Sequence, residues 1–126
     1  MNHPEPRRLD VPFLLHAAEL LQGDPQVDDY GLLYAAVARV NAHALGRDVY
    51  GSPHLKAAAL LHHLVRLPAL EHSNSAFAWH SCEAYLSLQG LRLRYPPQDA
   101  VALVHDAAEA ALGVPGIARR LRTWTT

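Results

Sequence analysis

The sequence predicts an all-α fold, a single compact bundle of about six helices. Apolar residues recur at helical spacing in six separate segments, and Gly, Pro and Asp punctuate the intervals of about two to eight residues between them. The chain has 126 residues, of which 50% are hydrophobic and 18% charged, which suits one folded domain. We therefore expect one domain over residues 1–126, with the proline-broken segment 1–8 as a flexible leader.

The first three helices are predicted from capping signals and apolar stripes. Pro12 and Pro53 each suit a first helical position, where the missing N–H costs nothing. The aspartates at 28–29 are candidate N-caps for the second helix, whose apolar stripe stops at Gly46. The first helix is predicted over 12–22, the second from its caps at 28–29 to Gly46, and the third over 53–67. The turn-rich connector 46–52 holds either a short hairpin or an ordered loop, and it is the one place where strand is expected.

Three more helices follow from the same signals. The polar loop 69–75 precedes a helix over about 76–89, for which Gly90 is the expected C-cap. Residues 91–95 alternate apolar and cationic side chains, as in a half-buried extended segment. The prolines at 96–97 end this segment, and a fifth helix is predicted from about Asp99 to Ala111. A short sixth helix is predicted after 113–116, ending near Trp124.

The charge, the cysteine count and the apolar runs of the chain limit which partners and cellular locations are expected. The formal net charge is -1 and the pI is about 6.7, so nucleic acid is not an expected partner. The single cysteine, Cys82, has no internal disulfide partner and fits a reducing cytoplasm. No signal-peptide pattern opens the chain and no apolar run reaches about 18 residues, so we expect neither secretion nor membrane insertion.

Nine histidines raise the question of a metal site. The adjacent His62 and His63 point about 100° apart on a helix, and no His-Glu-x-x-His spacing occurs. The dipeptide His105-Asp106 is too short to define a ligand set. Solvated or capping histidines are the simpler interpretation, and no metal site is predicted from these residues.

The third and fourth predicted helices resemble those that flank the active loop of the Fic/Doc (Fido) family, particularly its compact death-on-curing (Doc-like) toxins. The resemblance rests on residues 48–50, 56–62 and 64–66, with further matches at 31–33, Ala36, 38–39, 78–79, Leu86 and Gly90. It implies a Doc-like all-helical fold, a toxin of a bacterial toxin-antitoxin system, and an antitoxin or other protein as partner. It also implies ATP and Mg²⁺ as cofactors if the family activity survives.

In that family the loop reads His-x-Phe-x-(Asp/Glu)-(Gly/Ala)-Asn-(Gly/Lys)-Arg. The His is the general base for a target hydroxyl, the acid holds magnesium, and the remainder cradles the ATP phosphates at a helix N-terminus. Anchored on Arg66 and Trp79 without a gap, the motif falls on residues 68–76, where only Asn74 is retained. The base position holds Pro68, the Phe position Leu70, the metal-acid position His72, and the cationic positions Ser75 and Ala76.

Several residues of this loop remain candidates for a site. Ser73 and Asn74 are good helix N-caps, and together with Ser75 they are also the candidate anion or phosphate loop. His72 is the candidate substitute base, against the simpler interpretation of an exposed loop histidine. A one-residue shift of the alignment brings Glu71 near the metal-acid position, which makes it the candidate metal ligand.

The resulting hypothesis is a Doc-like toxin component whose nucleotide-transfer site is degraded and which acts by binding. One alternative is an active ATP-dependent transferase that attaches AMP or phosphate to a protein hydroxyl through a rebuilt site. The second alternative is a plain helical protein-interaction scaffold. The sequence leaves open which of the three applies, and it does not determine the oligomeric state.

Overall fold

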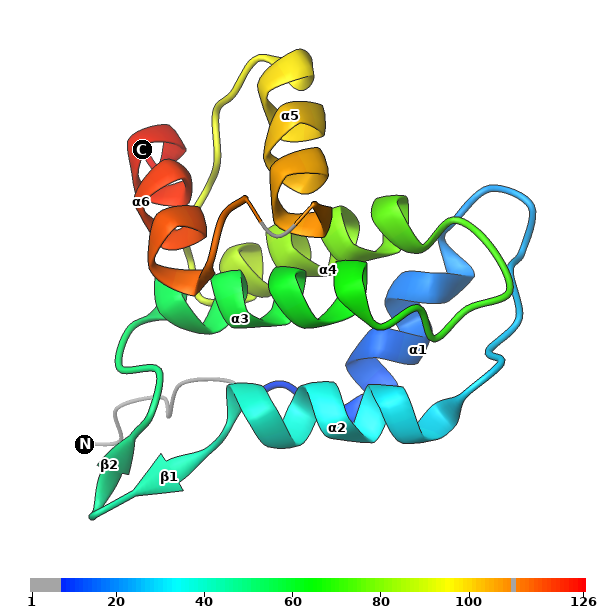
Figure 1. Ribbon diagram of the computed structural model, residues 1–126, viewed down its shortest axis with the longest axis horizontal. Coiled ribbons are helices and arrows are strands. Elements are labelled where there is room, and N and C mark those ends of the chain that lie inside the picture. The colour runs from blue at the N-terminus through cyan, green and yellow to red at the C-terminus, as the bar shows by residue number, and fades with distance from the viewer. Residues whose placement is uncertain (1–7, 110) are drawn as a thin grey trace.

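A computed structural model describes residues 8–109 and 111–126 of the chain. Most of the expected leader, residues 1–7, lies outside this part. The chain runs α1 (Val11–Glu19), α2 (Tyr30–Val40), β1 (His43–Ala44), β2 (Arg47–Asp48), α3 (Pro53–Arg66), α4 (Asn74–Leu88), α5 (Pro97–Ala108) and α6 (Val114–Trp124) (Figure 1). The all-α prediction is confirmed, with one small antiparallel hairpin as the only sheet among the described residues. None of the described helices is long and apolar enough to cross a membrane.

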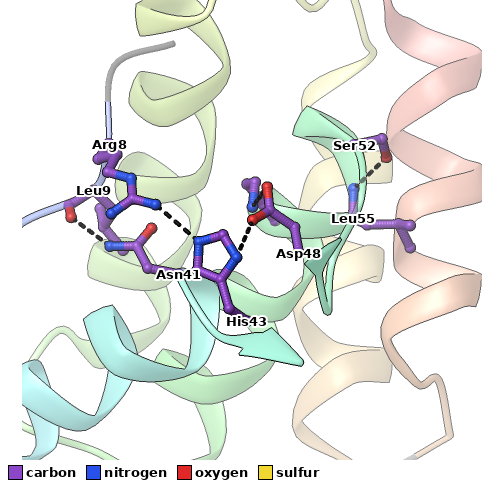
Figure 2. Close-up of polar contacts among 8 residues, drawn as sticks. Arg8, Leu9, Asn41, His43, Asp48, Ser52 and Leu55 are labelled. Atoms are coloured by element: carbon purple, nitrogen blue, oxygen red, sulfur yellow. Dashed lines mark hydrogen bonds and ion pairs between the residues drawn. The ribbon is translucent and has the colours of Figure 1, made fainter. Parts of the chain in front are cut away.

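Helix α3 is the centre of the bundle and packs against α2, α4, α5 and α6. Five consecutive residues, 57–61, are fully buried, so this helix is covered on all sides rather than along one stripe. Three of the five are alanines, whose small side chains allow the surrounding helices to approach closely. Ser52 caps the helix by accepting a hydrogen bond from the Leu55 N–H at 3.2 Å (Figure 2), and Pro53 lies in the first turn as predicted.

Helix α2 ends earlier than the sequence suggested, at Val40 rather than near Ala44. The side-chain amide of Asn41 donates to the Leu9 carbonyl at 2.9 Å, a contact between residues 32 positions apart (Figure 2). The chain then forms a hairpin whose two turn residues, Leu45 and Gly46, have φ of 53° and 78°. Two positive φ values fit the twist of a tight hairpin, which explains why a helix cannot continue to Gly46.

The other helices also differ from their predicted limits, by up to three residues at an end. Helix α1 ends at Glu19 rather than at 22, and α6 begins at Val114 rather than after 116. Helix α4 begins at Asn74, two residues before the expected start, and α5 runs from Pro97 to Ala108 instead of 99–111. The segment 91–95 is extended as predicted, and it lies against the end of α6. The Arg94 N–H donates to the Trp124 carbonyl at 2.7 Å, and Leu93 forms an isolated bridge with Thr125. This pairing anchors the C-terminal residues to the bundle.

Candidate functional site

The loop between α3 and α4, on which the sequence comparison above places the family motif, is bonded to the segment that precedes α2. The Glu71 N–H donates to the Gln26 carbonyl at 3.0 Å, and the Gln26 N–H donates to the Glu71 carboxylate at 2.9 Å. The Asp28 N–H donates to the Ala69 carbonyl at 2.8 Å. Ala69 and Leu70 are buried, so the middle of the loop packs into the core. The loop is therefore a fixed part of the bundle.

Asn74, the retained motif residue, holds this loop closed. Its side-chain oxygen accepts from the Leu70 N–H at 3.0 Å, and its side-chain nitrogen donates to the Leu70 carbonyl at 3.0 Å. The oxygen and the nitrogen of the side-chain amide thus both bond to the backbone of one buried residue. The sequence predicts a helix cap or an anion ligand for Asn74. In the structure its amide bonds to the Leu70 backbone, and anion binding by Asn74 stays a prediction.

Glu71, His72 and Ser73 form a short polar chain on the exposed surface of the loop. His72 Nδ1 lies 2.8 Å from the Ser73 hydroxyl, and His72 Nε2 lies 3.9 Å from Glu71 Oε1. Ser73 occupies the N-cap position of α4, but its side chain makes no capping hydrogen bond. Its φ of 65° lies in the left-handed region, at the motif position where the family has Gly or Ala.

The donor groups at the motif positions do not match a magnesium nucleotide site. Mg²⁺ prefers oxygen ligands, whereas the metal-acid position holds the imidazole of His72. The candidate ligand Glu71 already accepts the Gln26 N–H. Ser75 and Ala76 carry no charge to balance phosphate oxygens. Within residues 8–109 and 111–126, no group of three or more His, Cys, Asp or Glu side chains is placed to hold a metal ion.

Several of the other described histidines have structural partners. His63 is buried and its Nε2 lies 3.1 Å from the Leu32 carbonyl, while His62 Nδ1 lies 3.1 Å from the Arg39 guanidinium. Burial lowers the pKa of both imidazoles below the ordinary value of 6.5. Asp106 pairs with Arg120 at 2.9 Å rather than with His105. His62 and His63 are therefore hydrogen-bonded within the bundle, and neither is the solvated or capping residue that the sequence analysis expected.

An apolar groove opens beside the motif loop, between the N-terminal half of α4 and α5. Its volume is about 630 Å³. Ser75 and Ala76, the last two motif positions, lie at this groove. The other lining residues are mostly apolar: Trp79, Tyr95, Pro97, Ala100, Val101, Val104, His105 and Ala108. Val101 is apolar and yet 70% exposed, and it lies at the groove.

Aromatic side chains make one wall of the groove rigid. The rings of Trp79 and Tyr95 meet edge to face, with centroids 5.0 Å apart, and Trp124 packs against both. The Trp79 Nε1–H donates to the Tyr95 hydroxyl at 3.3 Å, and that hydroxyl donates to the Glu83 carboxylate at 2.8 Å. Burial, and then the bond to Glu83, raise the pKa of the Tyr95 phenol. The wall is thus pre-formed, as a binding surface requires.

A second polar cluster fastens the hairpin to the bundle (Figure 2). His43 lies between Arg8 and Asp48, with its Nε2 3.0 Å from the guanidinium and its Nδ1 3.1 Å from the carboxylate. Lys56 of α3 donates to the other Asp48 oxygen at 3.0 Å. The hydrogen bond from Lys56 is the main cause of a lowered Asp48 pKa. This cluster positions the hairpin and lies on different elements from the groove.

Comparison with known proteins confirms the expected resemblance to Doc-like toxins. No protein-family model matches the chain. A curated protein of Mycolicibacterium smegmatis named Toxin Doc is 45% identical over 71 residues. The aligned region is 56% of this chain and 55% of that relative, so the match spans about half the length of each.

Proposed function

We propose, starting from this relationship to a Doc toxin, that the protein is the toxin component of a toxin-antitoxin module and acts in the cytoplasm. We further propose that it acts by binding a protein partner and that its nucleotide-transfer site is degraded. Two neighbouring features carry the proposal. The loop at the motif positions has no general base or cationic side chains for nucleotide transfer, and an apolar groove lies beside it.

The loop supports the loss of transfer chemistry. Pro68 has no proton acceptor on its ring, and Ser75 and Ala76 have no charge. A positioned general base contributes about 10²- to 10⁴-fold to a rate, and one electrostatic donor about 10²- to 10³-fold. Asn74, the one retained residue, already bonds to Leu70 through both its side-chain oxygen and its side-chain nitrogen. Transfer from ATP by these residues should therefore be close to background.

The groove supports binding. A protein segment that inserts apolar side chains between α4 and α5 would cover Val101 and the Trp79–Tyr95 wall, and aromatic walls of this type carry much of the energy in protein interfaces. His105 and Ser75 lie among the lining residues and offer polar contacts that would orient such a segment. An amphipathic helix or an extended apolar peptide of an antitoxin fits this description.

Co-purification with a co-expressed candidate antitoxin tests the binding. Val101→Arg places a cation in the apolar groove and should weaken the complex by at least about 30-fold, equivalent to about 2 kcal/mol. Ala102→Arg is the matched control, because Ala102 is exposed on the same helix and does not line the groove. Equal affinity of the two variants would exclude the groove as the binding site.

The contact chain of Glu71, His72 and Ser73 favours the alternative of a rebuilt transferase, in which His72 is the base. Labelled ATP, magnesium and candidate target proteins distinguish the two functions. Robust transfer that is abolished in His72→Ala would establish the rebuilt enzyme and contradict the degraded site. If the protein neither transfers a group from ATP nor forms a complex with an antitoxin, the second alternative, a plain helical protein-interaction scaffold, is the function that is left.

A further inference from the structure

Helix α2 presents an uncharged outer face that no described element covers. Its eleven residues include one charge, Arg39, and its core side is formed by Leu33, Ala36 and Val40. On the opposite side, Tyr30 is 56% and Tyr34 is 63% exposed. The helix lies along one edge of the molecule (Figure 1). An amphipathic surface helix normally carries charged residues on its outer face, so the composition of α2 indicates a face that another surface covers.

The residues of this face alternate large and small. Gly31, Ala35 and Ala38 are exposed next to the two tyrosines. Helices approach closely where small residues face each other, and a tyrosine ring fills the space above an alanine on a facing helix. The face thus supplies both the projecting side chains and the recesses that a closely packed helix pair needs.

We propose that the outer face of α2 is a homodimer interface, in which it packs antiparallel against the same face of a second copy of this chain. A two-fold axis at Tyr34 sets Tyr30 opposite Ala38, since these residues lie four positions before and four after it. The same axis sets Asp29 opposite Arg39, five positions before and five after. An isologous contact requires this kind of self-complementarity.

The charges at the two ends of α2 support a second copy as the occupant. Asp28 and Asp29 are exposed at the N-terminal end, and no ion pair to either carboxylate occurs within the described ranges 8–109 and 111–126. Arg39, in the last turn, contacts the Tyr50 hydroxyl and His62 Nδ1 and lies 6.0 Å from the Tyr50 ring centroid, and no ion pair to an acid is found for it within the described ranges. An antiparallel copy brings acid to base at both ends of the interface at once.

The size of the face sets the expected strength. The eleven residues of α2 make a helix about 16 Å long. A single helix of this length buries less surface than the about 800 Å² that each partner buries in a standard interface. We therefore expect a reversible dimer that forms at micromolar concentration. The groove between α4 and α5 belongs to different helices, so this inference is independent of the proposed function.

Sedimentation equilibrium of the full chain between about 1 and 300 µM tests the dimer. The mass should rise with concentration toward twice 13.9 kDa. Ala35→Arg should stay at the monomer mass, while Ala102→Arg, which also places an arginine at an exposed helical alanine, should dimerise like the parent. Circular dichroism verifies that both variants are folded. If Ala35→Arg does not fold, Tyr34→Ser replaces it.

Disulfide trapping tests the antiparallel register. Tyr34→Cys should cross-link to its counterpart on the axis, whereas Tyr30→Cys should not, because eight residues of helix separate the two copies by about 12 Å. The native Cys82 is buried and gives no background. A parent that remains monomeric at 300 µM, an Ala35→Arg variant that still dimerises, or cross-linking of Tyr30→Cys would each overturn the proposal. A monomeric parent whose Ala35→Arg variant loses the antitoxin would assign the face to that partner instead.

Discussion

Replacing Asn74 by alanine tests whether this residue is a structural clamp. The change removes both hydrogen bonds to Leu70, which is 3% exposed, and leaves a backbone N–H and a carbonyl without partners. An unsatisfied buried polar group costs about 1–3 kcal/mol. Water admitted to the space left by the shorter side chain offsets part of this cost, so we expect a loss of about 2–4 kcal/mol in the free energy of unfolding.

Thermal denaturation followed by circular dichroism measures this loss. The unfolding entropy of globular proteins is about 2.1 cal/mol/K per residue, or about 0.26 kcal/mol/K for 126 residues. The expected loss therefore lowers Tm by about 8–15 °C. Ser75→Ala, one position along and exposed, should change stability by less than about 0.5 kcal/mol. An Asn74→Ala variant as stable as Ser75→Ala would refute the clamp, and a Tm that rises with magnesium-ATP in the parent alone would return Asn74 to phosphate binding.

Two further predictions concern pH and the hairpin. Burial holds the pKa of His63 below 6.5, so the unfolded chain binds a proton first as the pH falls, and stability should decrease from about pH 6.5 downward in denaturant titrations. The decrease should be shallower in His63→Gln, and an equal slope would contradict the assignment to His63. Leu45→Asn should raise the unfolding free energy by up to about 1 kcal/mol in the same titrations, since Asn tolerates the left-handed turn position better than a fully exposed Leu. A destabilised Leu45→Asn variant would show that the Leu45 side chain has a stabilising role of its own.

The sequence by itself determined the class and order of the helices, because the signals for them are local. Apolar spacing, Pro12 and Pro53 in first turns, and glycines after helix ends act within a few residues of the element they define. The resemblance to Doc-like toxins was also visible in the sequence, since it depends on residue identities in order.

Tertiary structure alone decided where α2 ends and what the motif loop does. The end of α2 depends on the contact of Asn41 with Leu9, and the loop depends on pairing with residues 26–28, which are more than 40 positions away from it. The sequence shows that Val101 is apolar, but whether its side chain is covered depends on the helix beside it. The groove exists because α5 leaves part of α4 uncovered, and the spacing between two packed helices is a property of their contacts that no local pattern encodes.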